Sequence, residues 1–296
     1  MICTSMTYAQ LRAFHHVALS GGFSRAAETL RLSQPAISEQ VRNLERDHDV
    51  LLFRRDRRQV ALTKAGEALF ALTRQFFDVE ARIGDLMSES RAAVEGELRL
   101  VVDAAHHVTE ILNLYRQAHP RVRIRLQTGN TERVLAELRN FTADVGVIGA
   151  EASEHDLDAV PLGHSPIIAF AAKGFAGVGP DVTLEQLAKL PLVLREQGSK
   201  TRAGLEAEAT RRGLRLTPAI IAEGREAVRH IVASGAGIGI TSAAEFSPDR
   251  RLKALPIMDI DVTMSETIVC LSQRRDVRAI RAFMDIAEQI TPAAGG

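Results

Sequence analysis

The first 62 residues have the hydrophobic spacing of short amphipathic helices separated by turn signals. In the first helix the apolar positions at helical spacing are Leu11, Phe14 and Ala18. Thr7 is placed to cap this helix, and Gly21-Gly22 to end it. A second helix has a face of small apolar residues, Ala26, Ala27 and Leu30, with Ser24 as its expected cap.

A third helix follows a tight turn at Leu32-Ser33. Ser33 is placed to cap it, and Pro35 falls in its first turn, where a missing N–H costs little. Its apolar positions are Ile37, Val41 and Leu44, which leaves an outward face of Ser38, Glu39, Gln40 and Arg42. Two short helices joined by a tight turn, the second with a polar outer face, predict a helix-turn-helix at about residues 23–42. The stretches 51–53 and 60–62, with arginines between them, predict a short hairpin, or wing.

From Thr63, the expected cap, a long helix is predicted over residues 63–93. Its apolar residues alternate steps of four and three, as in a coiled-coil heptad seam: Ala65, Leu69, Leu72, Phe76, Val79, Ile83 and Leu86. The alternative is a single amphipathic helix lying on its own domain. The regular alternation favours helix pairing, so we expect Leu69, Leu72, Phe76, Val79 and Ile83 to dimerise the chain.

From Gly96 onward apolar strands alternate with helices. Strands are expected at 98–102, 122–126, 144–148, 167–171, 192–194, 238–240 and 267–271, and helices at 108–118, 131–140 and about 276–290. This alternation predicts an α/β domain with mostly parallel sheets over 94–296. It is long enough for two subdomains with a ligand cleft, which we place at about 94–166 with 268–296, and at about 167–267.

Composition and charge narrow the class of protein. The 296 residues are 46% hydrophobic, no stretch is long and apolar enough for a membrane span, and the start lacks a secretory signal pattern, so a cytoplasmic protein with no membrane partner is expected. Whether Met1 or Met6 is the true start stays open. Two cysteines are too few for a disulfide scaffold or a cysteine-built zinc site. Residues 1–64 carry ten basic and six acidic side chains, and the rest of the chain has the opposite excess. The basic run 54–58 suits a polyanion binder, although a solvated loop would explain it equally well.

Motifs for enzyme chemistry are weak. Gly235-Ala236-Gly237-Ile238-Gly239 precedes a strand, the reverse of the dinucleotide-binding context, so turn glycines are the better interpretation. His106-His107 has no metal-ligand spacing around it, and we interpret the pair as cleft lining, with surface histidines as the alternative. We therefore expect no enzyme, metal or cofactor. An α/β enzyme or a solute-binding protein is the competing hypothesis.

The block from Phe23 to Glu45, with Leu52-Phe53-Arg54-Arg55 and Leu62-Thr63-Lys64-Ala65-Gly66, closely resembles the LysR-type transcriptional regulators. The resemblance implies an N-terminal all-α winged helix-turn-helix over 1–62, a linker helix over 63–93, and an effector domain like a periplasmic binding protein. It also implies binding to double-stranded promoter DNA, a homodimer or homotetramer, and RNA polymerase as a candidate partner. Whether such a regulator activates or represses is left open.

The expected DNA contacts follow from this likeness. Near the start of the recognition helix, Gln34, Pro35, Ser38 and Gln40 should face base edges. Arg54, Arg55, Arg57 and Arg58 should contact phosphates or enter the minor groove. The remaining expected DNA-binding residues are Ser24, Arg25, Ser33, Glu39 and Arg42. Glu39 departs from the basic residue common in relatives, and either accepts from cytosine N4 or pairs with Arg42.

A finer likeness, over residues 100–108, 194–202 and 224–228, is to the subgroup associated with 2-aminoethylphosphonate catabolism. Helix N-termini, hydroxyls and a guanidinium suit a small anion, and carboxylates suit an ammonium group. An amino acid or a dicarboxylate would suit the same groups. The expected effector-binding residues are Asp103, Ala104, His106, His107, Gly129, Asn130, Thr131, Ser199, Thr201, Arg202 and Glu226. The alternative for Ser199, Thr201 and Arg202 is that they only cap a helix.

Overall fold

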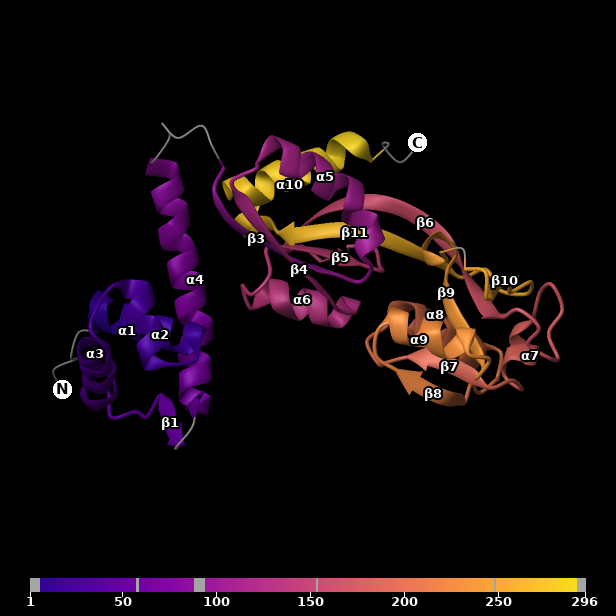
Figure 1. Cartoon of the computed structure of the whole chain (residues 1–296), viewed down its shortest axis with the longest axis horizontal. Coiled ribbons are helices and arrows are strands. Elements are labelled where there is room, and N and C mark those ends of the chain that lie inside the picture. Colours follow the sequence, from indigo (N-terminus) through magenta and orange to yellow (C-terminus); the bar gives the residue numbers. More distant parts are fainter. Residues whose placement is uncertain (1–5, 57–58, 88–93, 153, 248, 292–296) are drawn as a thin grey trace. The chain divides into compact units, whose positions relative to one another are not determined.

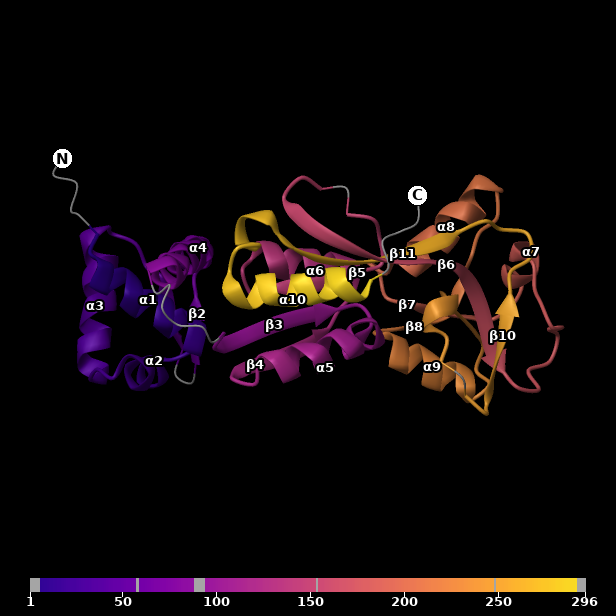
Figure 2. The ribbon, with the colours of Figure 1, turned by 90° about the horizontal axis from the view of Figure 1, so that it is seen from above.

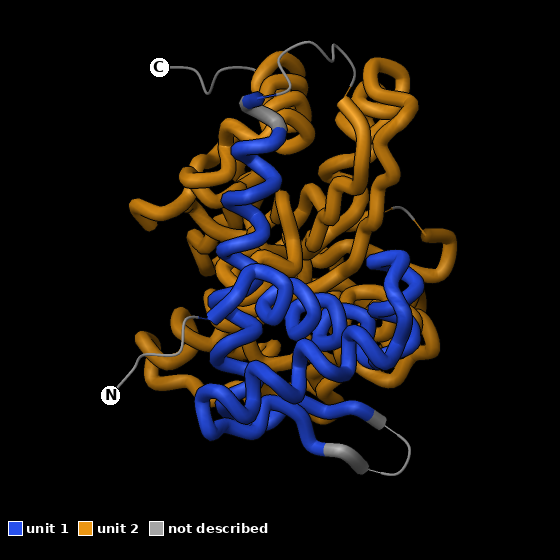
Figure 3. The backbone as a smooth tube through the Cα atoms, turned by 90° about the vertical axis from the view of Figure 1, so that its left-hand side faces the viewer, with its two compact units in different colours: residues 1–89 blue, residues 90–296 orange. Residues whose placement is uncertain are grey.

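The computed structural model describes residues 6–56, 59–87, 94–152, 154–247 and 249–291. The chain forms two compact units, residues 1–89 and 90–296 (Figure 3). In the described ranges, no helix combines the length and the apolar character that crossing a membrane requires.

Unit 1 consists of three short helices, a hairpin and one long helix: α1 (Tyr8–Ser20), α2 (Phe23–Leu30), α3 (Gln34–Asp47), β1 (Phe53–Asp56), β2 (Gln59–Leu62) and α4 (Lys64–Met87). Thr7 caps α1 in a capping box with Gln10, and Gly21 ends the helix in the left-handed conformation, φ 66°. Ser33 caps α3 as predicted. The expected Ser24 cap is wrong. The helix α2 begins two residues earlier than that cap would place it, with Gly22 in the cap position and no side-chain cap hydrogen bond, so Ser24 lies inside the first turn.

Most of the apolar positions that the helical spacing predicted lie in the core of unit 1. Phe14, Ala26, Ile37 and Val41 are each almost completely buried in one cluster. Val17, which was not predicted, is buried with them, whereas the predicted Leu11 is only half-buried. Ala26, with no side chain beyond Cβ, lets α1, α2 and α3 pack closely. The hairpin pairs β1 with β2 antiparallel, Phe53 opposite Leu62, and Phe53 packs its ring against Phe14.

Unit 2 alternates strands and helices, as predicted. Its strands are β3 (Gly96–Val102), β4 (Val122–Thr128), β5 (Val145–Ile148), β6 (Leu157–Ala172), β7 (Leu192–Arg195), β8 (Pro218–Ala222), β9 (Ile238–Ser242), β10 (Leu252–Pro256) and β11 (Thr263–Leu271). Its α-helices are α5 (Thr109–Ala118), α6 (Thr131–Arg139), α7 (Leu184–Leu187), α8 (Lys200–Arg211), α9 (Arg225–Ala233) and α10 (Arg278–Ile290). Three 3-10 turns complete it: η1 (Ala105–Val108), η2 (Ala243–Glu245) and η3 (Ser272–Arg274).

The strand order is β4-β3-β5-β11-β6-β9-β7-β8, with β10 also paired to β6. Pairing is parallel within β4-β3-β5 and within β9-β7-β8, but antiparallel wherever β11 or β6 takes part. The expectation of mostly parallel sheets is therefore wrong. The two long strands β6 and β11 run antiparallel to their neighbours and join two parallel halves.

Each half of unit 2 has hydrophobic clusters of its own. In the first half, called subdomain I here, α5 and α10 cover one face of β4-β3-β5, and α6 covers the other (Figures 1 and 2). In the second half, subdomain II, α8 packs on β7 and β9 through Leu205 and Ala209, and α9 packs through Val228 and Val232. The carboxyl ends of β3 and β7 consequently carry the chain into loops where polar residues gather.

Candidate functional site

The exposed face of α3 carries the residues predicted to read DNA. Gln34 and Pro35 are exposed in the first turn, and Ser38 and Gln40 are half-buried further along the helix. Gln34 Nε2 donates a hydrogen bond to Ser38 Oγ at 2.9 Å, which orients both side chains. The Ser33 hydroxyl accepts from the Ala36 amide, so it is engaged in capping α3.

The charged residues predicted to contact DNA belong to α2, α3 and the hairpin. Arg25, Glu39 and Arg42 are exposed, and no ion pair links Glu39 with Arg42 in the described ranges, so the pairing alternative is not supported. Arg54 is exposed on β1, with Nη2 3.5 Å from the Leu62 carbonyl oxygen. The predicted contacts Arg57 and Arg58 lie outside the described residues, and the side chain of Arg55 is not described.

The seam of α4 is exposed in the single chain. Leu72, Phe76, Val79 and Ile83 are between 46% and 62% exposed, whereas Leu69 packs against the core of unit 1. Thr63 Oγ1 accepts from the Gly66 amide at 3.0 Å, which is the predicted cap. A row of large apolar side chains open to solvent on a long helix marks an interaction surface.

A cavity of about 820 Å³ lies in unit 2, lined by residues of both subdomains. Six predicted residues belong to this lining: Asp103, Ala104, His106, Gly129, Asn130 and Glu226. They come from the end of β3, the turn before α6 and the first turn of α9. Further lining residues that the sequence reasoning missed include Arg133, Arg195, Glu196, Arg225 and Glu245.

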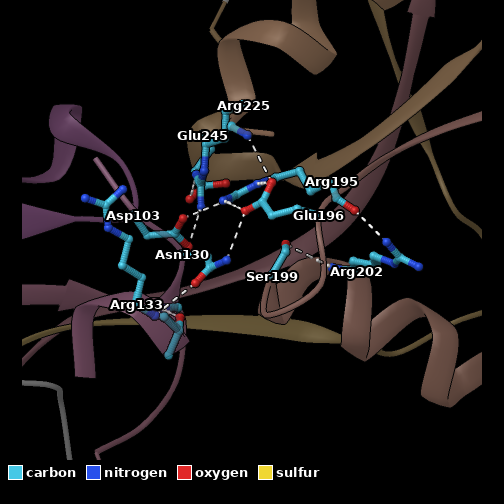
Figure 4. Close-up of polar contacts among 12 residues, drawn as sticks. Asp103, Asn130, Arg133, Arg195, Glu196, Ser199, Arg202, Arg225 and Glu245 are labelled. Atoms are coloured by element: carbon cyan, nitrogen blue, oxygen red, sulfur yellow. Dashed lines mark hydrogen bonds and ion pairs between the residues drawn. The ribbon is translucent and has the colours of Figure 1, made fainter. Parts of the chain in front are cut away.

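A buried ion-pair network forms the inner wall of the cavity (Figure 4). Asp103 Oδ1 pairs with Arg195 Nη1 at 2.8 Å, and Asp103 Oδ2 pairs with Arg225 Nη2 at 2.9 Å. Arg195 also holds Glu196 at 2.6 Å, and Arg225 pairs with Glu245. Asp103 belongs to subdomain I and the arginines to subdomain II, so these pairs connect the two halves of unit 2.

The network shifts the pKa values of its members. Although burial opposes it, hydrogen bonds from the Arg195 guanidinium and the Gly224 amide lower the pKa of Glu196 to about 2. Burial, with the positive charge of Arg225 adding to it, lowers the pKa of His106 to about 4. Glu196 is therefore ionised and His106 neutral near pH 7.

His107 lies behind the lining. Its ring centroid lies 3.8 Å from that of His106, and the two ring planes are tilted by 39°. His107 Nε2 lies 3.6 Å from Glu245 Oε1 and 3.6 Å from Glu266 Oε2. The three residues could hold a metal ion, which the sequence did not indicate because Glu245 and Glu266 are far from His107 along the chain.

Four other predicted effector residues are absent from the cavity lining. Ser199 accepts from the Arg202 amide as the cap of α8, and Thr131 Oγ1 accepts from the Gly149 amide at 3.1 Å. Thr201 is buried. Arg202 donates to the Arg195 carbonyl at 2.8 Å and to Glu206 at 2.8 Å, so its guanidinium is engaged within subdomain II. Ser199 therefore acts as a helix cap, as the alternative proposed. The Arg202 side chain makes contacts inside subdomain II.

Two of the missed residues lie at the end of a strand or at the start of a helix, which is a weak sequence signal for a functional site. Arg195 directly follows the apolar run 192–194 at the carboxyl end of a strand, and Arg225 follows Gly224 at the start of a helix. Charged residues at these two kinds of position converge in α/β folds.

Two family models cover nearly the whole chain. Residues 8–67 match "Bacterial regulatory helix-turn-helix protein, lysR family", and residues 91–291 match "LysR substrate binding domain". Among curated relatives, the chain is 30% identical over 291 residues to the transcriptional regulator CbbR of Sinorhizobium medicae, covering 97% of this chain and 92% of that protein. It is 28% identical to the transcriptional activator CmpR of Synechocystis, covering 86% and 85% of the two chains.

Solved structures show the same fold over the full length. A variant of full-length OxyR from Pseudomonas aeruginosa matches with a TM-score of 0.76 at 22% identity, covering 96% of this chain and 95% of that one. Full-length CbnR in complex with its target DNA matches with a TM-score of 0.67 at 21% identity, covering 96% and 99%. The winged helix-turn-helix, the long helix and the two-part α/β domain agree with these matches. The chain belongs to the LysR family and is a DNA-binding transcriptional regulator with a small-molecule effector domain.

Proposed function

We propose that the effector is a small zwitterion carrying a tetrahedral oxyanion and an ammonium group, with 2-aminoethylphosphonate as the ligand to test. The observation that carries this proposal is the lining of the unit 2 cavity, which brings Arg133 and Arg225 together with Glu226 and Glu245. A lining of one sign would suit a simple anion or a simple cation instead.

Two features of the cavity would attract the oxyanion end of the proposed ligand. Arg133 lies in the first turn of α6, is half exposed at the cavity, and offers N–H donors beyond the Nε that bonds Glu137 at 2.7 Å. The helices α6 and α9 both begin at the cavity, and α9 has no side-chain cap hydrogen bond. Free amide groups at a helix start favour negative charge.

The ammonium end is suited to Glu226, whose side chain is 80% exposed in the first turn of α9. Asp103, the other candidate from the sequence, is occupied by two guanidiniums and is better described as a support of the wall. The likeness of residues 100–108, 194–202 and 224–228 to the aminoethylphosphonate subgroup selects the phosphonate among ligands of this chemistry.

Calorimetric titration tests the proposal on the full chain. We expect saturable heat with 2-aminoethylphosphonate and a weaker response to phosphate, glutamate and the matching aminosulfonate. Arg133→Ala should weaken the phosphonate at least about tenfold, as loss of a charged hydrogen bond does. Arg202→Ala, outside the lining, should stay within about twofold, the scale of lost packing without a lost ligand contact. No phosphonate heat alongside saturable binding of glutamate would refute the assigned ligand.

The proposal for unit 1 is that α3 enters the major groove with Gln34, Pro35, Ser38 and Gln40 at base edges, and that the wing arginines contact phosphates. The exposed polar face of α3 supports it. Two copies joined along the exposed α4 seam would present two such helices to two half-sites, roughly 34–36 Å apart per helical turn. Dimer or tetramer, with RNA polymerase as a further partner, is the assembly we propose.

A further inference from the structure

We propose that His107, Glu245 and Glu266 form a binding site for one divalent transition-metal ion, with Zn²⁺ as its probe. The three side chains come from three elements: His107 from η1, Glu245 from η2 and Glu266 from β11. One ligand atom of each lies within 4.8 Å of the others.

Most polar atoms of this cluster lack partners. His107 Nε2 and both carboxylate oxygens of Glu266 are buried without a hydrogen bond among the described residues, whereas Glu245 Oε1 pairs with the Arg225 guanidinium and Glu245 Oε2 accepts from the Thr241 hydroxyl. The side chains of His107, Glu245 and Glu266 are only 10%, 3% and 4% exposed. Carboxylates removed from water without donors are costly, so such a cluster calls for a cation.

The spacing suits a metal better than direct hydrogen bonds. His107 Nε2 is 3.6 Å from an oxygen of each glutamate, too long for a hydrogen bond. Ligands about 2.1 Å from a tetrahedral ion lie about 3.4 Å from one another. A small contraction of the cluster would complete the coordination.

The charges of the network leave room for a dication. Among the described residues, the carboxyl groups of this network belong to Asp103, Glu196, Glu245 and Glu266, and the guanidiniums that pair with or face them belong to Arg195 and Arg225. The four carboxyl groups therefore outnumber the two guanidiniums by two. Arg225 keeps its pairs with Asp103 and Glu245, so Glu245 would bridge the guanidinium and the ion, as carboxylates beside metal ligands commonly do.

Backbone geometry aims Glu266 at this site. The pairing of β11 with β6 shifts register between Glu266 and Thr267, and such an irregularity redirects a side chain relative to a regular strand. One imidazole with two carboxylates and no thiol favours Zn²⁺, Mn²⁺ or Fe²⁺ over softer metals. Three protein ligands would leave one coordination position for water or another small ligand, and Glu245 also belongs to the cavity lining.

Equilibrium dialysis of the untagged full chain with Zn²⁺ tests the site. We expect one ion per chain at micromolar Zn²⁺, a higher melting temperature with the ion, and a Kd at least tenfold weaker in His107→Gln and Glu266→Gln. The matched control is His230→Gln, because His230 and Glu226 form an exposed pair at 3.8 Å that could bind zinc adventitiously. That variant should stay within twofold.

No saturable zinc binding by the wild type, or equal affinity in His107→Gln and Glu266→Gln, would overturn the proposal, as would loss of binding in His230→Gln. X-ray absorption at the zinc edge of the wild type gives a second readout that needs no variant. It should show nitrogen and oxygen neighbours, and a sulfur neighbour would contradict the assignment.

Discussion

Asp103, at the carboxyl end of β3, and Arg195, at the carboxyl end of β7, are joined at 2.8 Å although 92 residues separate them. Both side chains are buried, and each belongs to a different subdomain of unit 2. Arg225 takes the other oxygen of Asp103. One carboxylate therefore holds two guanidiniums of subdomain II against subdomain I.

Replacing this carboxylate should destabilise unit 2 strongly. Asp103→Asn keeps the shape of the side chain but leaves two buried guanidiniums without their negative partner. Breaking a buried ion pair in this way costs about 3–5 kcal/mol in the free energy of unfolding. Urea denaturation followed by circular dichroism measures this free energy. The control Asp156→Asn removes an exposed partner of Arg139 and should cost about 0–1 kcal/mol. Equal losses in the two variants would contradict the role of Asp103.

Substitutions in the wing and in the recognition helix should affect DNA binding in different ways. Arg54→Ala should weaken binding to all DNA sequences and reduce the slope of log affinity against log salt by about one. Gln34→Ala should instead change sequence preference, with about 1–3 kcal/mol lost at a contacted base pair. Fluorescence anisotropy at several salt concentrations separates the two effects. Arg121→Ala, an exposed arginine of unit 2, is the control and should leave the slope unchanged.

If the exposed seam of α4 pairs two chains, a charge placed in it should separate them. Leu72→Glu and Val79→Glu would bury carboxylates between apolar side chains, which is costly without a partner. Sedimentation velocity should then report half or less of the wild-type mass. Ala81→Glu adds the same charge at an exposed α4 position outside the seam and should sediment as the wild type. Seam variants of wild-type mass would exclude this interface.

Stability of unit 1 should fall with acid through His15. Burial, together with the nearby charges of His16 and Arg74, lowers the pKa of His15 from 6.5 to about 4. The unfolded chain takes up this proton first, so the stabilisation is complete above about pH 6.5 and is lost as the pH falls toward 4. His15→Gln should melt with a weaker pH dependence over this window, whereas His48→Gln, at an exposed position, should follow the wild type. If the melting temperatures of His15→Gln and the wild type change with pH in the same way, the role of His15 is refuted.

The sequence predicted the features that depend on interactions between residues close together along the chain. Thr7 and Ser33 cap their helices because the cap and the amides it bonds are three residues apart. The antiparallel direction of β11 could not be predicted, since an apolar strand has the same pattern in either direction. The strand β8 was missed because it is short and alternates half-buried and exposed residues behind Pro218.

The site was harder to predict than the fold. Asp103, His106 and Asn130 were found because they follow strands, where ligand sites form. Arg195, Glu245 and Glu266 were missed since their importance comes from one another, and no spacing along the chain brings them together. Ser199 and Arg202 have the right chemistry, but their hydrogen bonds turn them to α8 and to the Arg195 carbonyl.

The most direct test of effector-controlled DNA binding is fluorescence anisotropy with a labelled DNA fragment from upstream of the protein's own coding sequence. We predict that the unlabelled fragment competes at least about a thousandfold better than scrambled DNA at physiological salt. We also predict that 2-aminoethylphosphonate shifts the Kd or the anisotropy of the complex in the wild type but not in Arg133→Ala. Equal competition by scrambled DNA, or a complex that no zwitterion alters, would contradict the account.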